Sequence, residues 1–236
     1  MYVRIINGKG ENSLKKLVGF LVFLLVLTLF ADSSFATNTS FKRGDAAKYA
    51  SDWVSQNNTN VYYVANPDCT NFASQCLRAG GMIMLKQGFA YSTLDAWYAG
   101  SGGGCATWEN ADMFRKHWAN INDVGYNRGY QMIKVKAGDI KPYTDASDKI
   151  YMSNIYNKVK PGDIIQYYDA KKIGIVPGCT QGTYHSQVVH RTSVENGESK
   201  VSMAQHTANE WKNLRAYVRQ SISDDAILCI ILVSSI

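Results

Sequence analysis

The stretch NPDCTNFASQCLRAGG, residues 66–81, predicts a helix that begins at a cysteine and ends at a glycine pair. Apolar side chains recur in it at helical spacing: Phe72, Cys76 and Ala79. Asp68 is suited to the N-cap position, because its side-chain oxygen can accept from the free backbone N–H groups of a first turn. Cys69 then lies in that first turn, where the helix dipole favours the thiolate, the nucleophilic form of cysteine. This stretch alone leaves two interpretations open, a nucleophile and a buried structural thiol.

The chain has five cysteines, an odd number that leaves at least one thiol unpaired in an oxidising compartment. Cys76 lies two helical turns beyond Cys69, too far along the axis for a disulfide. Cys105 and Cys179 could pair. The sequence does not show which of Cys76, Cys105, Cys179 and Cys229 are joined in disulfides. No CxxC or HxxxH spacing occurs, so the sequence predicts neither a metal site nor a cofactor.

The first 36 residues have the pattern of a signal peptide. A basic start precedes an uncharged apolar run, residues 17–30, and small residues follow at 34–36. The run is shorter than the roughly 20 residues that a membrane-spanning helix needs. We therefore expect cleavage before Thr37, export to the medium or cell wall, and no stable membrane insertion after cleavage. An uncleaved anchor is the alternative.

The remaining 200 residues carry 21 Lys and Arg against 17 Asp and Glu, a net charge of +4. This bias suits an anionic wall. The sequence has no Lys/Arg cluster interleaved with aromatic residues, so it does not predict nucleic-acid binding. A chain of this length can fill one core, so residues 37–236 are expected to form one domain.

Helical patterns come first along the chain, at residues 45–56, 69–79 and 107–118. Strand patterns follow at 130–136, 162–168, 184–191, 199–206 and 226–233, and the last is apolar enough for a buried central strand. This order predicts an α+β fold with the helices packed on one face of an antiparallel sheet.

Three segments carry a resemblance when taken in order: DCTNFASQCLRAGG at 68–81, GDIIQY at 162–167 and HSQVV at 185–189. With AQHTAN at 204–209, they resemble the putative amidase domain family of secreted bacterial proteins, within the papain-like NlpC/CHAP superfamily. The resemblance implies a papain-like fold and a cysteine hydrolase in which Cys69 is the nucleophile and His185 its general base. Strand alternation puts His185 and His190 on opposite faces, so both cannot face the cysteine.

The resemblance also implies further site residues. A polar residue on the strand after the histidine strand would orient the base, which favours His206, with Asn209 as runner-up. A tyrosine upstream of the cysteine would complete an oxyanion hole with the Cys69 N–H, which points weakly to Tyr62 or Tyr63. The segment 170–184 is longer than its counterpart in relatives, and we expect it to border the cleft.

The expected function is a secreted cysteine amidase or peptidase that cleaves peptide amide bonds through a thioester, with peptidoglycan stem peptides as substrate. Two alternatives remain at this point. One is an acyltransferase or deamidase acting on proteins, because these reactions share the same thioester. The other is a non-catalytic module that binds the wall or a host surface.

Overall fold

A computed structural model describes residues 41–85, 94–100, 102–119, 130–141, 155–169, 182–195 and 197–233. The expected signal peptide lies outside these ranges, as do Cys179 and most of the segment 170–184. None of the helices within the described ranges is long and apolar enough to cross a membrane.

A six-stranded antiparallel sheet forms the centre of the described fold, with strand order β3-β8-β4-β5-β6-β7. Its strands are β3 (Met132–Lys136), β4 (Ile164–Tyr168), β5 (Thr183–Glu195), β6 (Glu198–Gln205), β7 (Glu210–Asn213) and β8 (Ile227–Ile231). The apolar segment near the C-terminus is indeed a central strand, because β8 pairs with β3 on one side and β4 on the other. A separate two-stranded sheet joins β1 (Ala99–Gly100) to β2 (Gly103–Gly104).

The helices within the described ranges are α2 (Arg43–Trp53), α3 (Cys69–Ala79), α4 (Ala106–Glu109), α5 (Ala111–Trp118), α6 (Ala137–Ile140) and α8 (Leu214–Ser221). The expected helix 107–118 is two helices, because Asn110 begins a new one. Its side-chain oxygen accepts from the N–H groups of Asp112 and Met113 at 3.0 and 3.1 Å.

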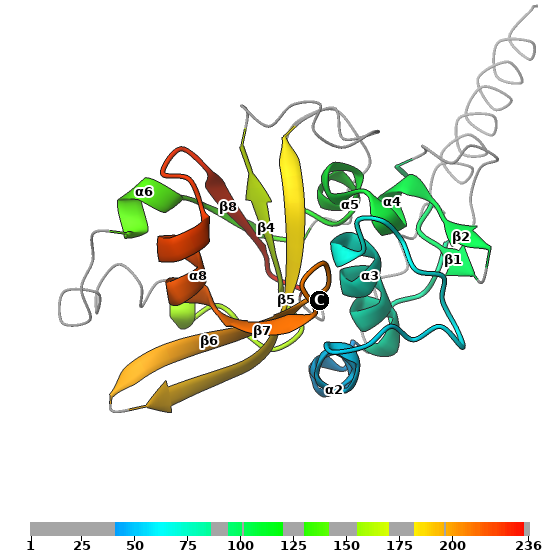
Figure 1. The fold of residues 1–236 in the computed structure, drawn as a ribbon, viewed down its shortest axis with the longest axis horizontal. Helices are drawn as coiled ribbons and strands as arrows, with labels where there is room; N and C mark the ends of the chain where they lie inside the picture. The colour runs from blue at the N-terminus through cyan, green and yellow to red at the C-terminus, as the bar shows by residue number, and fades with distance from the viewer. Residues whose placement is uncertain are drawn as a thin grey trace, which may run out of the picture. The chain divides into compact units, whose positions relative to one another are not determined.

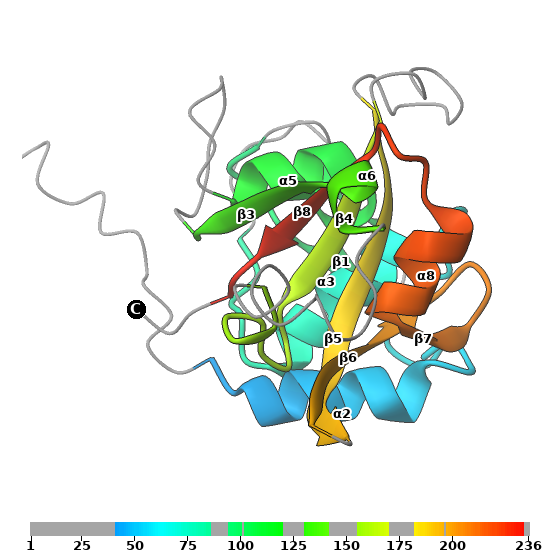
Figure 2. The same ribbon diagram turned by 90° about the vertical axis from the view of Figure 1, so that its left-hand side faces the viewer.

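Helices cover both faces of the sheet, which corrects the expectation that they pack on one face (Figures 1 and 2). Phe72 of α3 and Phe114 of α5 belong to the core on one face, together with Val188 of β5. Leu214 and Val218 of α8 belong to the core on the other face. The fold is α+β with an antiparallel sheet, as predicted, but both of its faces are buried. The second face needs a cover because alternate residues of β4, β5 and β8 are apolar on that side as well.

Candidate active site

The start of α3 meets the middle of β5. Cys69 is the first residue of α3 and is 3 % exposed. The next residue, Thr70, shares a hydrogen bond with Ser186 of β5, with 2.9 Å between the two hydroxyl oxygens. Residues 116 positions apart in the chain are thereby held together, and His185 of β5 is brought to the thiol.

Opposing influences act on the Cys69 thiol. Burial by itself would raise its pKa. A hydrogen bond from His185, the positive charge of that imidazole, the N–H of Ser186 and the hydroxyl of Thr70 act the other way. The balance lowers the pKa of Cys69 below the ordinary thiol value, which increases the thiolate fraction at neutral pH.

The remaining described cysteines lie in other surroundings. Cys76, Cys105 and Cys229 also carry free thiols, so Cys105 is not in a disulfide. Burial raises the pKa of Cys76 and of Cys229. The sulfur of Cys105 lies 3.0 Å from the hydroxyl of Thr107. Among the described cysteines, Cys69 is the one with the environment of a nucleophile.

Gln205, the last residue of β6, holds the ring of His185. The His185 Nε2 atom lies 2.9 Å from Gln205 Oε1. The same oxygen accepts from the side-chain amide of Gln187, whose own oxygen accepts from the Tyr167 hydroxyl at 2.6 Å. Because Gln205 presents an oxygen, His185 must carry its proton on Nε2, and Nδ1 is left to act on the thiol.

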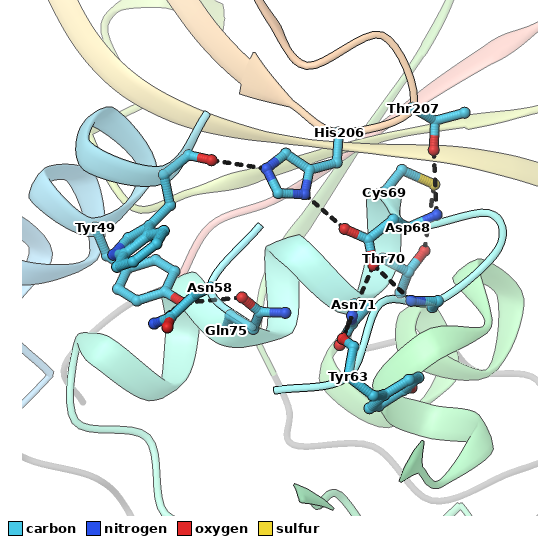
Figure 3. Close-up of polar contacts among 12 residues, drawn as sticks. Tyr49, Asn58, Tyr63, Asp68, Cys69, Thr70, Asn71, Gln75, His206 and Thr207 are labelled. Atoms are coloured by element: carbon cyan, nitrogen blue, oxygen red, sulfur yellow. Dashed lines mark hydrogen bonds and ion pairs between the residues drawn. The ribbon is translucent and has the colours of Figure 1, made fainter. Parts of the chain in front are cut away.

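The structure corrects the prediction that His206 orients the base (Figure 3). His206 Nδ1 lies 2.5 Å from Asp68 Oδ2, and its Nε2 lies 2.8 Å from the Trp53 carbonyl oxygen. Its ring stacks on Phe72 with centroids 3.9 Å apart. Both ring nitrogens are therefore engaged away from His185. The runner-up, Asn209, lies in the turn after β6, and its side chain makes no hydrogen bond with the described residues.

Asp68 occupies the N-cap position, but its side chain does not cap α3. One carboxylate oxygen pairs with His206, and the other accepts from the N–H of Ala65 and the side-chain amide of Asn71, at 2.9 and 2.7 Å. These partners occupy both oxygens of the carboxylate. The N–H groups in the first turn of α3 are thus left without a side-chain cap from this residue.

Neither upstream tyrosine is positioned as predicted. The Tyr63 hydroxyl donates to the carboxylate of Glu109, and the Tyr62 ring packs against Trp108 with centroids 5.7 Å apart. A tyrosine that the sequence analysis missed, Tyr217 of α8, lies near the site instead. Its ring centroid is 6.2 Å from that of His185. Burial raises the pKa of its phenol, and the charge of Cys69 raises it further.

His190 lies away from the site, as strand alternation predicts. Its Nδ1 atom is 3.5 Å from the Ser51 hydroxyl of α2, and its ring packs on Trp211 with centroids 4.0 Å apart. Burial, and after it the charge of Arg191, lowers the pKa of His190 to about 4. No cluster of three or more His, Cys, Asp or Glu that could hold a metal ion occurs among the residues with a described position.

Comparisons with known proteins agree with the motif pattern. The family model "Putative amidase domain" matches residues 40–229. The chain is also similar to the uncharacterized protein YjcM of Bacillus subtilis (strain 168), with 30 % identity over 186 residues. That alignment covers 78 % of this chain but 35 % of the relative, so the chain spans about a third of the length of that protein. No solved structure gives a significant match.

Proposed function

Since the chain belongs to the putative amidase domain family, we propose that it is a cysteine amidase in which Cys69 is the nucleophile and His185 the general base. The observation that carries the proposal is the environment of Cys69. A thiol at a helix start is hydrogen-bonded by a histidine, and the other ring nitrogen of that histidine is fixed by Gln205. A nucleophile, a base and a group that orients the base are the parts that covalent amide hydrolysis requires.

Acylation begins with transfer of the thiol proton to Nδ1 of His185, which gives a thiolate–imidazolium pair. The Cys69 sulfur then attacks the amide carbonyl carbon, and the carbonyl oxygen becomes an oxyanion. The imidazolium donates its proton to the amide nitrogen as the C–N bond breaks. The amine leaves, and the acyl group stays on Cys69 as a thioester.

Deacylation uses the same groups in the reverse roles. His185 takes a proton from water, the resulting hydroxide attacks the thioester carbonyl, and the Cys69 thiolate leaves. The N–H of Cys69 and the hydroxyl of Tyr217 are our candidates for oxyanion donors. Cys69 begins α3, and the Tyr217 ring lies near His185, where the charge of Cys69 raises the pKa of its phenol after burial does.

Peptidoglycan stem peptides are the substrate that we propose. The signal-peptide pattern of residues 1–36 supports export, and the net charge of +4 on the remaining residues suits an anionic wall. The stem peptides of this wall contain amide bonds, which are the bonds that the proposed site would cleave. Acyl transfer and side-chain deamidation pass through the same thioester and form the second candidate class.

The test incubates the purified protein with soluble muropeptides and follows the products by mass spectrometry. Hydrolysis is expected to add one water per bond cut and to give shortened stem peptides with a new amine and a new carboxylate. The Cys69→Ala variant, as the matched control, is expected to leave the muropeptides unchanged.

Other products would redirect the proposal. Joined peptides without added water would indicate acyl transfer, and conversion of glutamine to glutamate in an added protein would indicate deamidation. Unchanged muropeptides with both proteins would contradict the peptidoglycan proposal. Equal turnover by wild type and Cys69→Ala would contradict the cysteine mechanism itself.

Gln205→Met is expected to lower kcat about 100-fold, because a thioether cannot fix the His185 tautomer as the amide oxygen does. Gln205→Glu is expected to keep most of the activity, since a carboxylate accepts from Nε2–H and from Gln187 alike. Steady-state rates on the cleaved muropeptide measure both. Gln75→Met is the matched control, because Gln75 bonds the Tyr49 hydroxyl rather than His185. Full activity of Gln205→Met would mean that the base needs no orienting residue.

A further inference from the structure

His206 and Asp68 form a buried ion pair that the mechanism above does not use. His206 is 1 % exposed and Asp68 7 % exposed. Both ring nitrogens of His206 face acceptors, a carboxylate oxygen at 2.5 Å and a backbone carbonyl oxygen at 2.8 Å. A neutral imidazole has one N–H and could satisfy only one of these acceptors. The carbonyl oxygen can only accept, so Nε2 donates to it, and the contact with Asp68 needs a further proton between Nδ1 and Oδ2, which neutralises the pair.

The pair joins three segments at the point where α3 begins. His206 contacts Trp53, the last residue of α2, through the backbone carbonyl. Asp68 donates its own N–H to the hydroxyl of Thr207, at 3.1 Å, in the turn between β6 and β7. Figure 3 shows the imidazole between the end of α2 and the Asp68 carboxylate, with Cys69 next along the chain.

The turn itself has an unusual backbone. Thr207, Ala208 and Asn209 all have positive φ values, of 64°, 120° and 24°. Residues other than glycine rarely adopt this region, because the Cβ atom crowds the backbone there. A strained turn persists where its surroundings fix it. Here the hydrogen bond from the Asp68 N–H to Thr207 and the contacts of the buried His206 fix the turn.

Asp68 directly precedes Cys69 in the chain. A carboxylate beside a thiolate opposes the formation of the second negative charge. Tyr49 and Tyr63, whose pKa values are raised mainly by burial, are further titratable groups that the Asp68 charge reaches. A positive charge on His206 would lie directly against this carboxylate and would oppose its effect.

We propose that His206 is a positioning residue whose imidazolium neutralises Asp68, so that the carboxylate preceding Cys69 does not oppose formation of the thiolate. The proposal rests on the proposed function, since the thiolate matters only if Cys69 is the nucleophile. It assigns His206 a role different from orientation of the base.

The experiment measures the rate at which iodoacetamide alkylates Cys69 as a function of pH, with mass spectrometry to locate the label. It compares the full-length wild type with His206→Asn, Asp68→Asn and the double variant. In His206→Asn the amide can still donate to Asp68, but the positive charge is gone. We expect its titration midpoint to rise by about one pH unit, so that alkylation well below the midpoint is about ten-fold slower.

The other variants separate charge from packing. Asp68→Asn removes the carboxylate, so its midpoint is expected to stay at or below the wild-type value. The double variant removes both charges, and its midpoint is expected to return toward wild type. His190→Asn, which changes a histidine on the opposite side of β5, should match the wild-type profile.

Three results would overturn the proposal: an unshifted midpoint in His206→Asn, a double variant shifted as far as His206→Asn, or an upward shift in Asp68→Asn. Circular dichroism establishes that each variant is folded. If His206→Asn does not fold, His206→Gln, which removes the same charge, takes its place. The readout is thiol reactivity, so it remains interpretable whether or not muropeptides are cleaved, and loss of the proposed function would appear separately in the mass-spectrometric assay.

Discussion

Cys69→Ser is expected to lower kcat/KM by at least about 10⁴-fold while leaving the fold intact. A serine hydroxyl fits the same space but is a much weaker acid than a thiol. The hydrogen bonds and charge that lower the pKa of Cys69 are too weak to ionise a serine hydroxyl at neutral pH. Activity on muropeptides and the thermal unfolding midpoint measure the two parts of the prediction.

The control for this substitution is Cys76→Ala in the same helix. Burial raises the pKa of Cys76, so this thiol stays protonated. We expect Cys76→Ala to lose some stability, because it leaves a small cavity in the core, and to keep its turnover. Substantial activity in Cys69→Ser would show that the nucleophile lies elsewhere.

His185→Ala is expected to lower kcat by about 10⁴-fold and to raise the pKa of the Cys69 thiol. The sign follows from the opposing influences at this sulfur. Burial raises the pKa, and the hydrogen bond and charge of His185 are the first influences that lower it. Without the imidazole, burial dominates and the pKa should exceed the ordinary thiol value. The thiolate is then scarce at neutral pH, and the iodoacetamide titration curve moves to higher pH.

His190→Ala is the matched control for this histidine. Burial and Arg191 already keep the pKa of His190 at about 4, so the ring is neutral at pH 7 and supplies no charge. We expect turnover close to that of wild type. An unchanged thiol titration in His185→Ala would contradict the assignment of His185 as the partner of Cys69.

Local patterns predicted two features that the structure shows. The apolar spacing predicts the start of α3 at Cys69, although the Asp68 side chain does not cap the helix as expected, and strand alternation predicts the opposite orientations of His185 and His190. Both inferences use residues close together in the sequence. They depend on no long-range register.

The choice between Gln205 and His206 could not be made in this way. These neighbours point to opposite faces of the strand end, and which of them meets His185 depends on how β6 pairs with β5. That pairing contains a register irregularity between Val189 and Arg191, and no local sequence pattern predicts this irregularity. The family resemblance favours the histidine, whereas the strand register places Gln205 against His185.

Long-range packing explains the other differences. Tyr217 reaches the site because α8 covers the second face of the sheet, whereas the sequence predicts helices on one face only. Glu210–Asn213 pairs with β6 as β7, so α8 begins only at Leu214. Asn213 then caps α8, accepting from the Ala216 N–H at 3.2 Å.

The left-handed turn at 207–209 has a consequence for anyone who engineers this protein for heat resistance. Glycine is the usual remedy for positive φ, and Ala208, whose side chain makes no polar contact, would accept it without loss. At Thr207 the same remedy would remove the hydroxyl that receives the Asp68 N–H. Selection for thermostability alone would treat the two positions alike, although only one of them is connected to the nucleophile's helix.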